Sequence, residues 1–223
     1  MASINQVVSE IANALQQPLS VPLREAARLS IIHNRARLIR HSFEQHHTID
    51  KSIQQRFRIS LIDCPDGDIP DTDDFDLTIV KRSAQRVPVP VRLNNGIPFL
   101  SVRTAGTEHA VEIPYITEIA AQYYKHLPGC CPQSHYDFIN QYIYIGFYKQ
   151  CPYKTLGSVI VEAPFENPFG QTEEHYDGSH EYDDDDEFMI SEDIIGDLKK
   201  LVMEEIGQRV FETNEIPTSN LVK

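Results

Sequence analysis

The spacing of the apolar residues changes twice along the chain. Near both ends, apolar residues recur every three or four positions, which is typical of one buried helix face. In the middle, Phe57, Ile59 and Leu61 alternate with residues such as Arg58 and Ser60, which indicates a strand with one buried face. A helical spacing does not suit a strand, and the reverse also holds. The chain is therefore predicted to be an α+β protein whose β-rich part lies between terminal helices.

Helices are predicted at both ends of the chain. The first covers residues 3–17, with Ser3 as its N-cap and Pro18 after its end. The second begins at Pro22, and its apolar stripe has the heptad-like spacing of a helix–helix seam: Leu29, Ile32, Ala36, Ile39 and Phe43. The last begins after Ser191 and has an apolar face of Ile194, Ile195, Leu198, Leu201, Val202 and Ile206. We expect the seam and this face to pack together in a helical bundle.

The β-rich region is then an insertion in the bundle. We expect residues 1–56 and 188–212 to form the helical bundle and residues 57–170 to form the central β-rich insertion. Residues 171–187 are predicted to be an acidic loop, and residues 213–223 an extended C-terminal tail. The sequence has no apolar run long enough for a transmembrane helix, so we expect no membrane partner.

The net charge of −13 is concentrated in one part of the chain. Sixteen of the 33 acidic residues lie between Glu173 and Glu215, together with only three of the 20 basic residues, so the rest of the chain is neutral. This distribution argues against nucleic-acid binding through a generally basic surface.

No motif for catalysis or for a resident metal ion is found in the sequence. It contains no glycine-rich phosphate loop, no nucleophile elbow and no CxxC pair. His46 and His47 are adjacent, so their side chains point apart on a helix or strand. The consecutive acids Asp183–Glu187 lack the Asn and Gly that alternate with acids in a calcium loop, which favours a solvated charge run. We therefore predict no enzymatic activity, no cofactor and no metal site.

Five short segments of the chain are distinctive in their order and spacing. They are Pro90–Leu93, Ile97–Phe99, Phe138–Ile145, Val161–Pro168 and Ile190–Leu198. In these segments the chain resembles the ring, or head–tail adaptor, proteins of tailed bacteriophages, most closely those of crAss-like phages. The resemblance covers residues 87 to 210, whereas the first 60 residues share only their helical character with that family.

The resemblance implies a structural protein of the virion neck or tail. Such proteins dock as a homo-oligomeric ring, usually a dodecamer, under the portal protein, where they connect the capsid to the tail and continue the DNA channel. The implied partners are the portal protein, neighbouring copies, further tail or ring proteins, and DNA that passes without sequence-specific binding. The implied location is the virion, after assembly in the host cytoplasm.

Other functions stay open. The chain could be a different structural component of the tail or baseplate. A metal-dependent enzyme that uses the acidic run is disfavoured, because two-metal sites need carboxylates that converge from separate elements. An acidic mimic that binds a host nucleic-acid-binding protein would be a soluble monomer rather than part of a particle.

Two oppositely charged surfaces are the candidate contact sites, because a ring built by one repeated contact needs two unlike surfaces that match. The predicted subunit or portal interface consists of Arg24, Arg28, Arg35, Arg37, Arg40, Ile194, Leu198 and Leu201. The predicted acidic surface consists of Glu173, Glu174, Asp183, Asp184, Asp185, Asp186 and Glu187. These acids would face either the arginines of a neighbouring copy or the DNA channel, whose wall should not attract phosphate.

Overall fold

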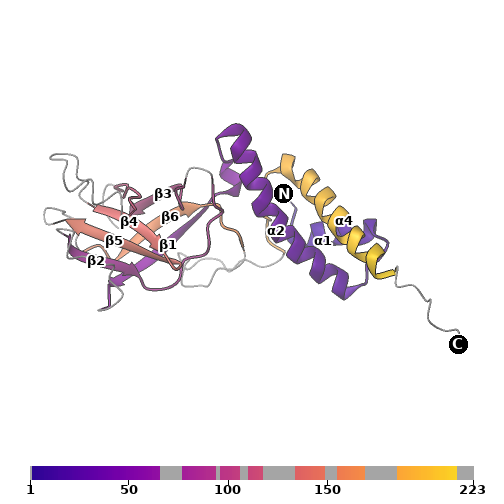
Figure 1. The fold of residues 1–223 in the computed structure, drawn as a ribbon, viewed down its shortest axis with the longest axis horizontal. Coiled ribbons are helices and arrows are strands. Elements are labelled where there is room, and N and C mark those ends of the chain that lie inside the picture. The colour runs from indigo at the N-terminus through magenta and orange to yellow at the C-terminus, as the bar shows by residue number, and fades with distance from the viewer. Residues whose placement is uncertain are drawn as a thin grey trace, which may run out of the picture. The chain divides into compact units, whose positions relative to one another are not determined.

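The chain folds into two compact units, one made of Met1–Ile53 with Tyr182–Lys223 and the other of Gln54–Glu181. Among the described residues, the α-helices lie in the first unit and a six-stranded antiparallel sheet lies in the second (Figure 1). The α+β class predicted from the apolar spacing is therefore confirmed. The computed structural model describes residues 2–65, 77–93, 96–105, 110–117, 134–148, 155–168 and 185–214. Within these residues, no helix has the length and apolar character needed to cross a membrane.

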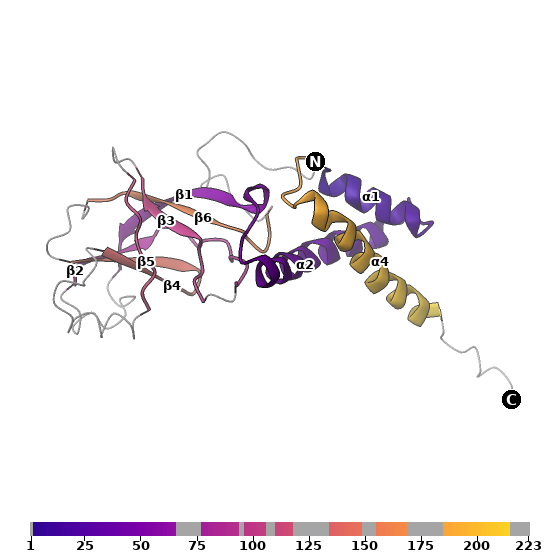
Figure 2. The same ribbon diagram turned by 90° about the horizontal axis from the view of Figure 1, so that it is seen from above.

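The helical unit is formed by segments from both ends of the chain. Its elements are α1 (Ile4–Ala14), α2 (Val21–His46), a short 3-10 helix (Lys51–Ile53) and α4 (Glu192–Asn214). The helices α1, α2 and α4 all contact one another (Figures 1 and 2). Ser3 is the N-cap of α1, as predicted, and its hydroxyl accepts a 3.2 Å hydrogen bond from the backbone N–H of Gln6.

The buried face of α2 differs from the predicted seam. Leu29, the first residue of that seam, is 70% exposed. Three polar residues, Ser30, Asn34 and Arg35, are buried instead, along with apolar neighbours. At 3.6 residues per turn, the centre of the predicted seam lies roughly two-fifths of a turn away from the centre of the buried face in the structure. The seam prediction is therefore wrong at Leu29, whereas Ile39 of the seam is buried and Ile32, Ala36 and Phe43 are half-buried. The apolar spacing alone missed the polar residues that have partners inside the unit.

The second unit is a curled sheet. Its strands are β1 (Gln55–Asp63), β2 (Leu77–Ser83), β3 (Ser101–Thr104), β4 (Ser134–Ile139), β5 (Tyr142–Tyr148) and β6 (Ser158–Ala163). Their order in the sheet is β3-β6-β1-β2-β5-β4. The two halves of the sheet share β1, because Gln55–Ser60 pair with β6 whereas Leu61–Asp63 pair with β2.

The segment Val111–Ile116 connects the two outermost strands of the sheet. Val102 and Thr104 of β3 form backbone hydrogen bonds of 2.8 and 2.9 Å with one end of this segment. Tyr136 of β4 forms two backbone hydrogen bonds, of 3.1 and 3.0 Å, with its other end. Backbone groups at the edge of a sheet need partners, and here one segment supplies partners to both edges.

The interior of the curled sheet is apolar, and the strand pattern accounts for it. Phe57, Ile59 and Leu61 of β1 are buried in the core of this unit, whereas Arg56 and Arg58 between them are exposed. The predicted alternation along this strand is therefore confirmed.

Candidate assembly interface

The arginines of α2 do not form one surface. Given 3.6 residues per turn, Arg24, Arg28 and Arg35 project from one side of the helix, while Arg37 and Arg40 project from another. Arg28 and Arg37 are exposed, whereas Arg24 and Arg40 are half-buried. The predicted arginine set is therefore divided between two sides of the helix, and each side has one exposed arginine.

Arg24 connects α2 to α1 within the helical unit. One of its terminal nitrogens, Nη2, donates a 3.0 Å hydrogen bond to the hydroxyl of Ser9, and the other, Nη1, donates a 3.5 Å hydrogen bond to the carbonyl of Pro18. These contacts hold the end of α1 against the first turn of α2.

Arg35 is fully buried, which corrects its expected position on an outward face. Its Nε donates a 2.7 Å hydrogen bond to the carbonyl of Met189, and its guanidinium carbon lies 5.9 Å from the ring centre of Phe188. Burial lowers the pKa of Arg35 to about 10, so the side chain remains charged at neutral pH. Arg35 therefore fixes the residues just before α4 and is covered by its own subunit.

The apolar residues expected at the interface lie mostly inside the helical unit as well. Ile194 and Leu198 are buried, and Leu201 is half-buried. Together with Val202 and Ile206, they belong to a helix that packs on α1 and α2, so the apolar face of α4 is used within the subunit. The assignment of Ile194 and Leu198 to a surface between subunits is corrected by this burial.

A polar cluster between α2 and α4 was missed by the sequence analysis. The Ser30 hydroxyl donates a 2.5 Å hydrogen bond to a carboxylate oxygen of Glu205, and the Asn34 amide donates a 3.0 Å bond to the same oxygen. The signal in the sequence is the pair of polar residues four positions apart, which share one helix face. The cluster explains why a polar strip on α2 can be buried, since its groups are hydrogen-bonded across the helix contact.

The acidic surface lies only partly within the described residues. Glu173, Glu174, Asp183 and Asp184 lie outside them. Asp185 accepts a 2.7 Å hydrogen bond from the side-chain amide of Asn5, and Glu187 forms a backbone bridge with Ser3. Acidic groups are favoured near the N-terminus of a helix, where the helix dipole is positive. The end of the acidic run, Asp185–Glu187, therefore lies next to the start of α1 in the same subunit.

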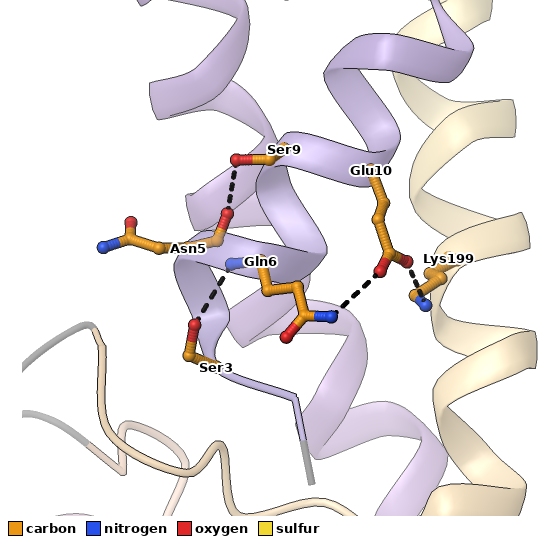
Figure 3. A network of polar contacts seen from close by, with 6 residues as sticks. All are labelled: Ser3, Asn5, Gln6, Ser9, Glu10 and Lys199. Atoms are coloured by element: carbon orange, nitrogen blue, oxygen red, sulfur yellow. Dashed lines mark hydrogen bonds and ion pairs between the residues drawn. The ribbon is translucent and has the colours of Figure 1, made fainter.

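Further polar contacts tie α1 to its neighbours (Figure 3). The carboxylate of Glu10 pairs with the ammonium group of Lys199 on α4 and also accepts a 3.4 Å hydrogen bond from Gln6. The contact with Lys199 lowers the pKa of Glu10 below its ordinary value. The Ser9 hydroxyl donates a 2.7 Å hydrogen bond to the backbone carbonyl of Asn5, four residues earlier on the same helix.

A cavity of about 260 Å³ lies between the end of α2 and the start of α4, and His46, Asp50 and Asp193 are among its lining residues. Asp50 accepts a 2.9 Å hydrogen bond from the backbone N–H of Ser52, which lowers the pKa of its carboxyl group. Within the described ranges, no three His, Cys, Asp or Glu side chains are grouped so that they could bind a metal ion.

Comparison with known families identifies the chain's relatives. A family model described as phage tail ring protein 2 matches residues 5–220, which span both the helical and the β-rich unit. No curated protein matches the chain in sequence. The family is one of structural components of the phage tail, and the resemblance to ring proteins of crAss-like phages is confirmed. The chain therefore belongs to the crAss ring 2 family of phage tail ring proteins.

Proposed function

We propose that the chain forms a homo-oligomeric ring below the portal, connects the capsid to the tail and continues the DNA channel. The observation that carries this proposal is the family match, which extends across both units of the chain. A ring needs many copies of one chain and a contact that repeats around the axis. We further propose a dodecamer and a purely structural role without enzymatic activity.

In this proposal the two parts of the chain have different tasks. The helices of residues 1–56 and 188–212 form the bundle that is the body of the subunit. The β-rich region of residues 57–170 contacts neighbouring copies or the next ring. The acidic loop of residues 171–187 and the tail of residues 213–223 reach a neighbouring copy, the portal or the channel wall.

Binding to the portal protein, rather than to another tail protein, tests the proposed position of the ring. We expect the purified chain, mixed with the portal protein of the same phage, to be recovered as a ring on the portal, with its copy number readable by native mass spectrometry. The alternative is a different ring of the tail or baseplate, with which the family description is also compatible because it names only the tail. That alternative predicts no complex with the portal and a stable complex with a tail protein. Absence of the chain from purified virions would contradict both.

Charged contacts between copies are the second testable part of the proposal. With Arg35 buried, Arg28 and Arg37 are the exposed arginines of α2, and a neighbouring acidic segment would meet one of them because they lie on opposite sides of the helix. Reversing both to Glu is expected to lower incorporation into particles about tenfold, or about 1.4 kcal/mol, with the loss growing at low salt. The exposed Lys200 of α4, reversed to Glu, is the matched control. If the double variant incorporates as the wild type does, the acidic segment has another partner, and the DNA channel becomes the better placement.

A further inference from the structure

The most exposed large apolar side chains of the described residues lie in the turn from α1 into α2 and on the first nine residues of α2. Leu19 is 91% exposed, Leu29 is 70% exposed and Val21 is 63% exposed. Val21, Glu25 and Leu29 are four residues apart in turn, so they share one face of α2, with the exposed Glu25 between two apolar groups. We call Leu19, Val21, Glu25 and Leu29 the apolar corner. An apolar patch of this kind marks a contact surface.

The apolar corner has a fixed shape. Pro18 and Pro22 flank it, and their rings restrict the backbone around Leu19 and Val21. Arg24 holds the corner from inside through its hydrogen bonds to Pro18 and Ser9. A surface that is already ordered loses little conformational entropy on binding.

A concave surface with both apolar and polar lining lies on the other unit of the same chain. It is a groove of about 550 Å³ whose lining includes Leu93, Ile97, Tyr115 and Phe138, with the exposed Arg92 among them. Ile97 is 42% exposed, so an apolar group of the groove is open to solvent. Among the described residues that line the groove, Arg92 is the only Lys, Arg, Asp or Glu.

The groove is also built on fixed backbone. One wall comes from the turn between β4 and β5, where Asn140 and Gln141 have positive φ angles of 52° and 67°, as in a type I′ turn. The carbonyl of Gln141 accepts a 2.7 Å hydrogen bond from the N–H of Val87. Another wall residue, Tyr115, belongs to the segment Val111–Ile116 that connects the outer strands.

We propose that the apolar corner of one copy seats in this groove on a neighbouring copy, with Glu25 facing Arg92. The proposal rests on the proposed function, because it takes a ring of identical copies as given. A repeated head-to-tail contact needs a convex and a concave surface on every chain, and this chain has both. The acid of the corner, Glu25, can pair with the arginine of the groove, Arg92. The exposed Arg28, seven residues after Val21, borders the corner on the same side of α2.

Thiol cross-linking in assembled particles tests the contact. Leu19→Cys and Ile97→Cys are combined in one chain, and phage particles that carry it are treated with a short bis-maleimide. We expect a ladder of dimers, trimers and larger multimers on a denaturing gel. Each single variant is the control for the native Cys64, Cys130, Cys131 and Cys151 and should give no ladder.

Other results would overturn the proposal in distinguishable ways. If the double-cysteine variant is present in the particles but gives no multimer ladder, the apolar corner and the groove do not meet. Cross-linked monomers mean that the corner meets the groove of its own chain, and a series that stops at dimers means a symmetric pair rather than a ring. Absence of the wild-type chain from the particles instead contradicts the proposed function itself.

A charge exchange gives a second measurement that does not depend on cross-linking. Glu25→Arg and Arg92→Glu are each expected to lower incorporation into particles at least fivefold, and the double variant should restore it. Single variants that incorporate normally, or a double variant that remains as poor as the worse single one, would overturn the pairing of the two residues.

Discussion

Replacing Arg35 with alanine is expected to destabilise the helical unit by about 3 kcal/mol. The substitution removes one of the largest fully buried side chains and leaves a cavity between α2 and the residues before α4. It also deprives the half-buried Met189 carbonyl of the donor that lies 2.7 Å away. Hydrogen exchange of the peptides that contain α2 and α4 measures the loss separately from the β-rich unit.

Arg35→Met is the matched control for this prediction. Burial penalises the charge of Arg35, as its lowered pKa of about 10 indicates. An apolar chain of similar length keeps most of the packing and avoids that penalty, so we expect it to stay within about 1 kcal/mol of the wild type. Equal losses in the alanine and methionine variants would show that the hydrogen bond to Met189 matters more than the packing. An alanine variant as stable as the wild type would contradict the structural role of Arg35.

The β-rich unit is expected to lose about 3 kcal/mol of stability as the pH falls from about 6.5 to about 4. The cause is His135 on β4, which is buried, so that its pKa is lowered to about 4. In the unfolded chain, the same imidazole binds a proton near its ordinary pKa of 6.5. Between these two values the unfolded state holds more protons than the folded state, so its free energy falls relative to the folded state as acid is added.

The variant His135→Gln isolates this effect, because glutamine does not titrate and has a similar size. We expect its stability to change little across the same pH range, measured by hydrogen exchange of the β4 and β5 peptides. Asp50 and Glu10, whose carboxyl groups have lowered pKa values, lie in the helical unit and are the same in both proteins, so they do not account for a difference between the two profiles. Parallel pH profiles for the variant and the wild type would rule out His135 as the cause.

Residues whose environment is local were predictable from the sequence. Ser3 caps α1 because its hydroxyl meets a backbone N–H three residues later, and this geometry needs no distant partner. The alternation of buried and exposed residues along β1 was equally predictable, because successive side chains of a strand point to opposite faces of the sheet.

Long-range partners explain what the sequence could not predict. Ser30 and Asn34 are buried because Glu205 accepts from both, and Glu205 lies more than 170 residues further along the chain. The same holds for Arg35, whose acceptor is the carbonyl of Met189. For this reason the apolar spacing of α2 pointed to the wrong face, and the candidate interface included residues that the subunit itself covers. The groove likewise depends on backbone hydrogen bonds that leave no apolar pattern.

The connection made by Val111–Ile116 affects how copies of this chain can coexist at high density. An unpaired sheet edge is a template on which an identical chain can add a strand, and such additions continue without limit into fibres. In the described part of this sheet, both outer strands already exchange backbone hydrogen bonds with that one segment. Copies at high concentration therefore have less opportunity to add strands to one another. They are left with contacts between side chains, which can build a closed ring.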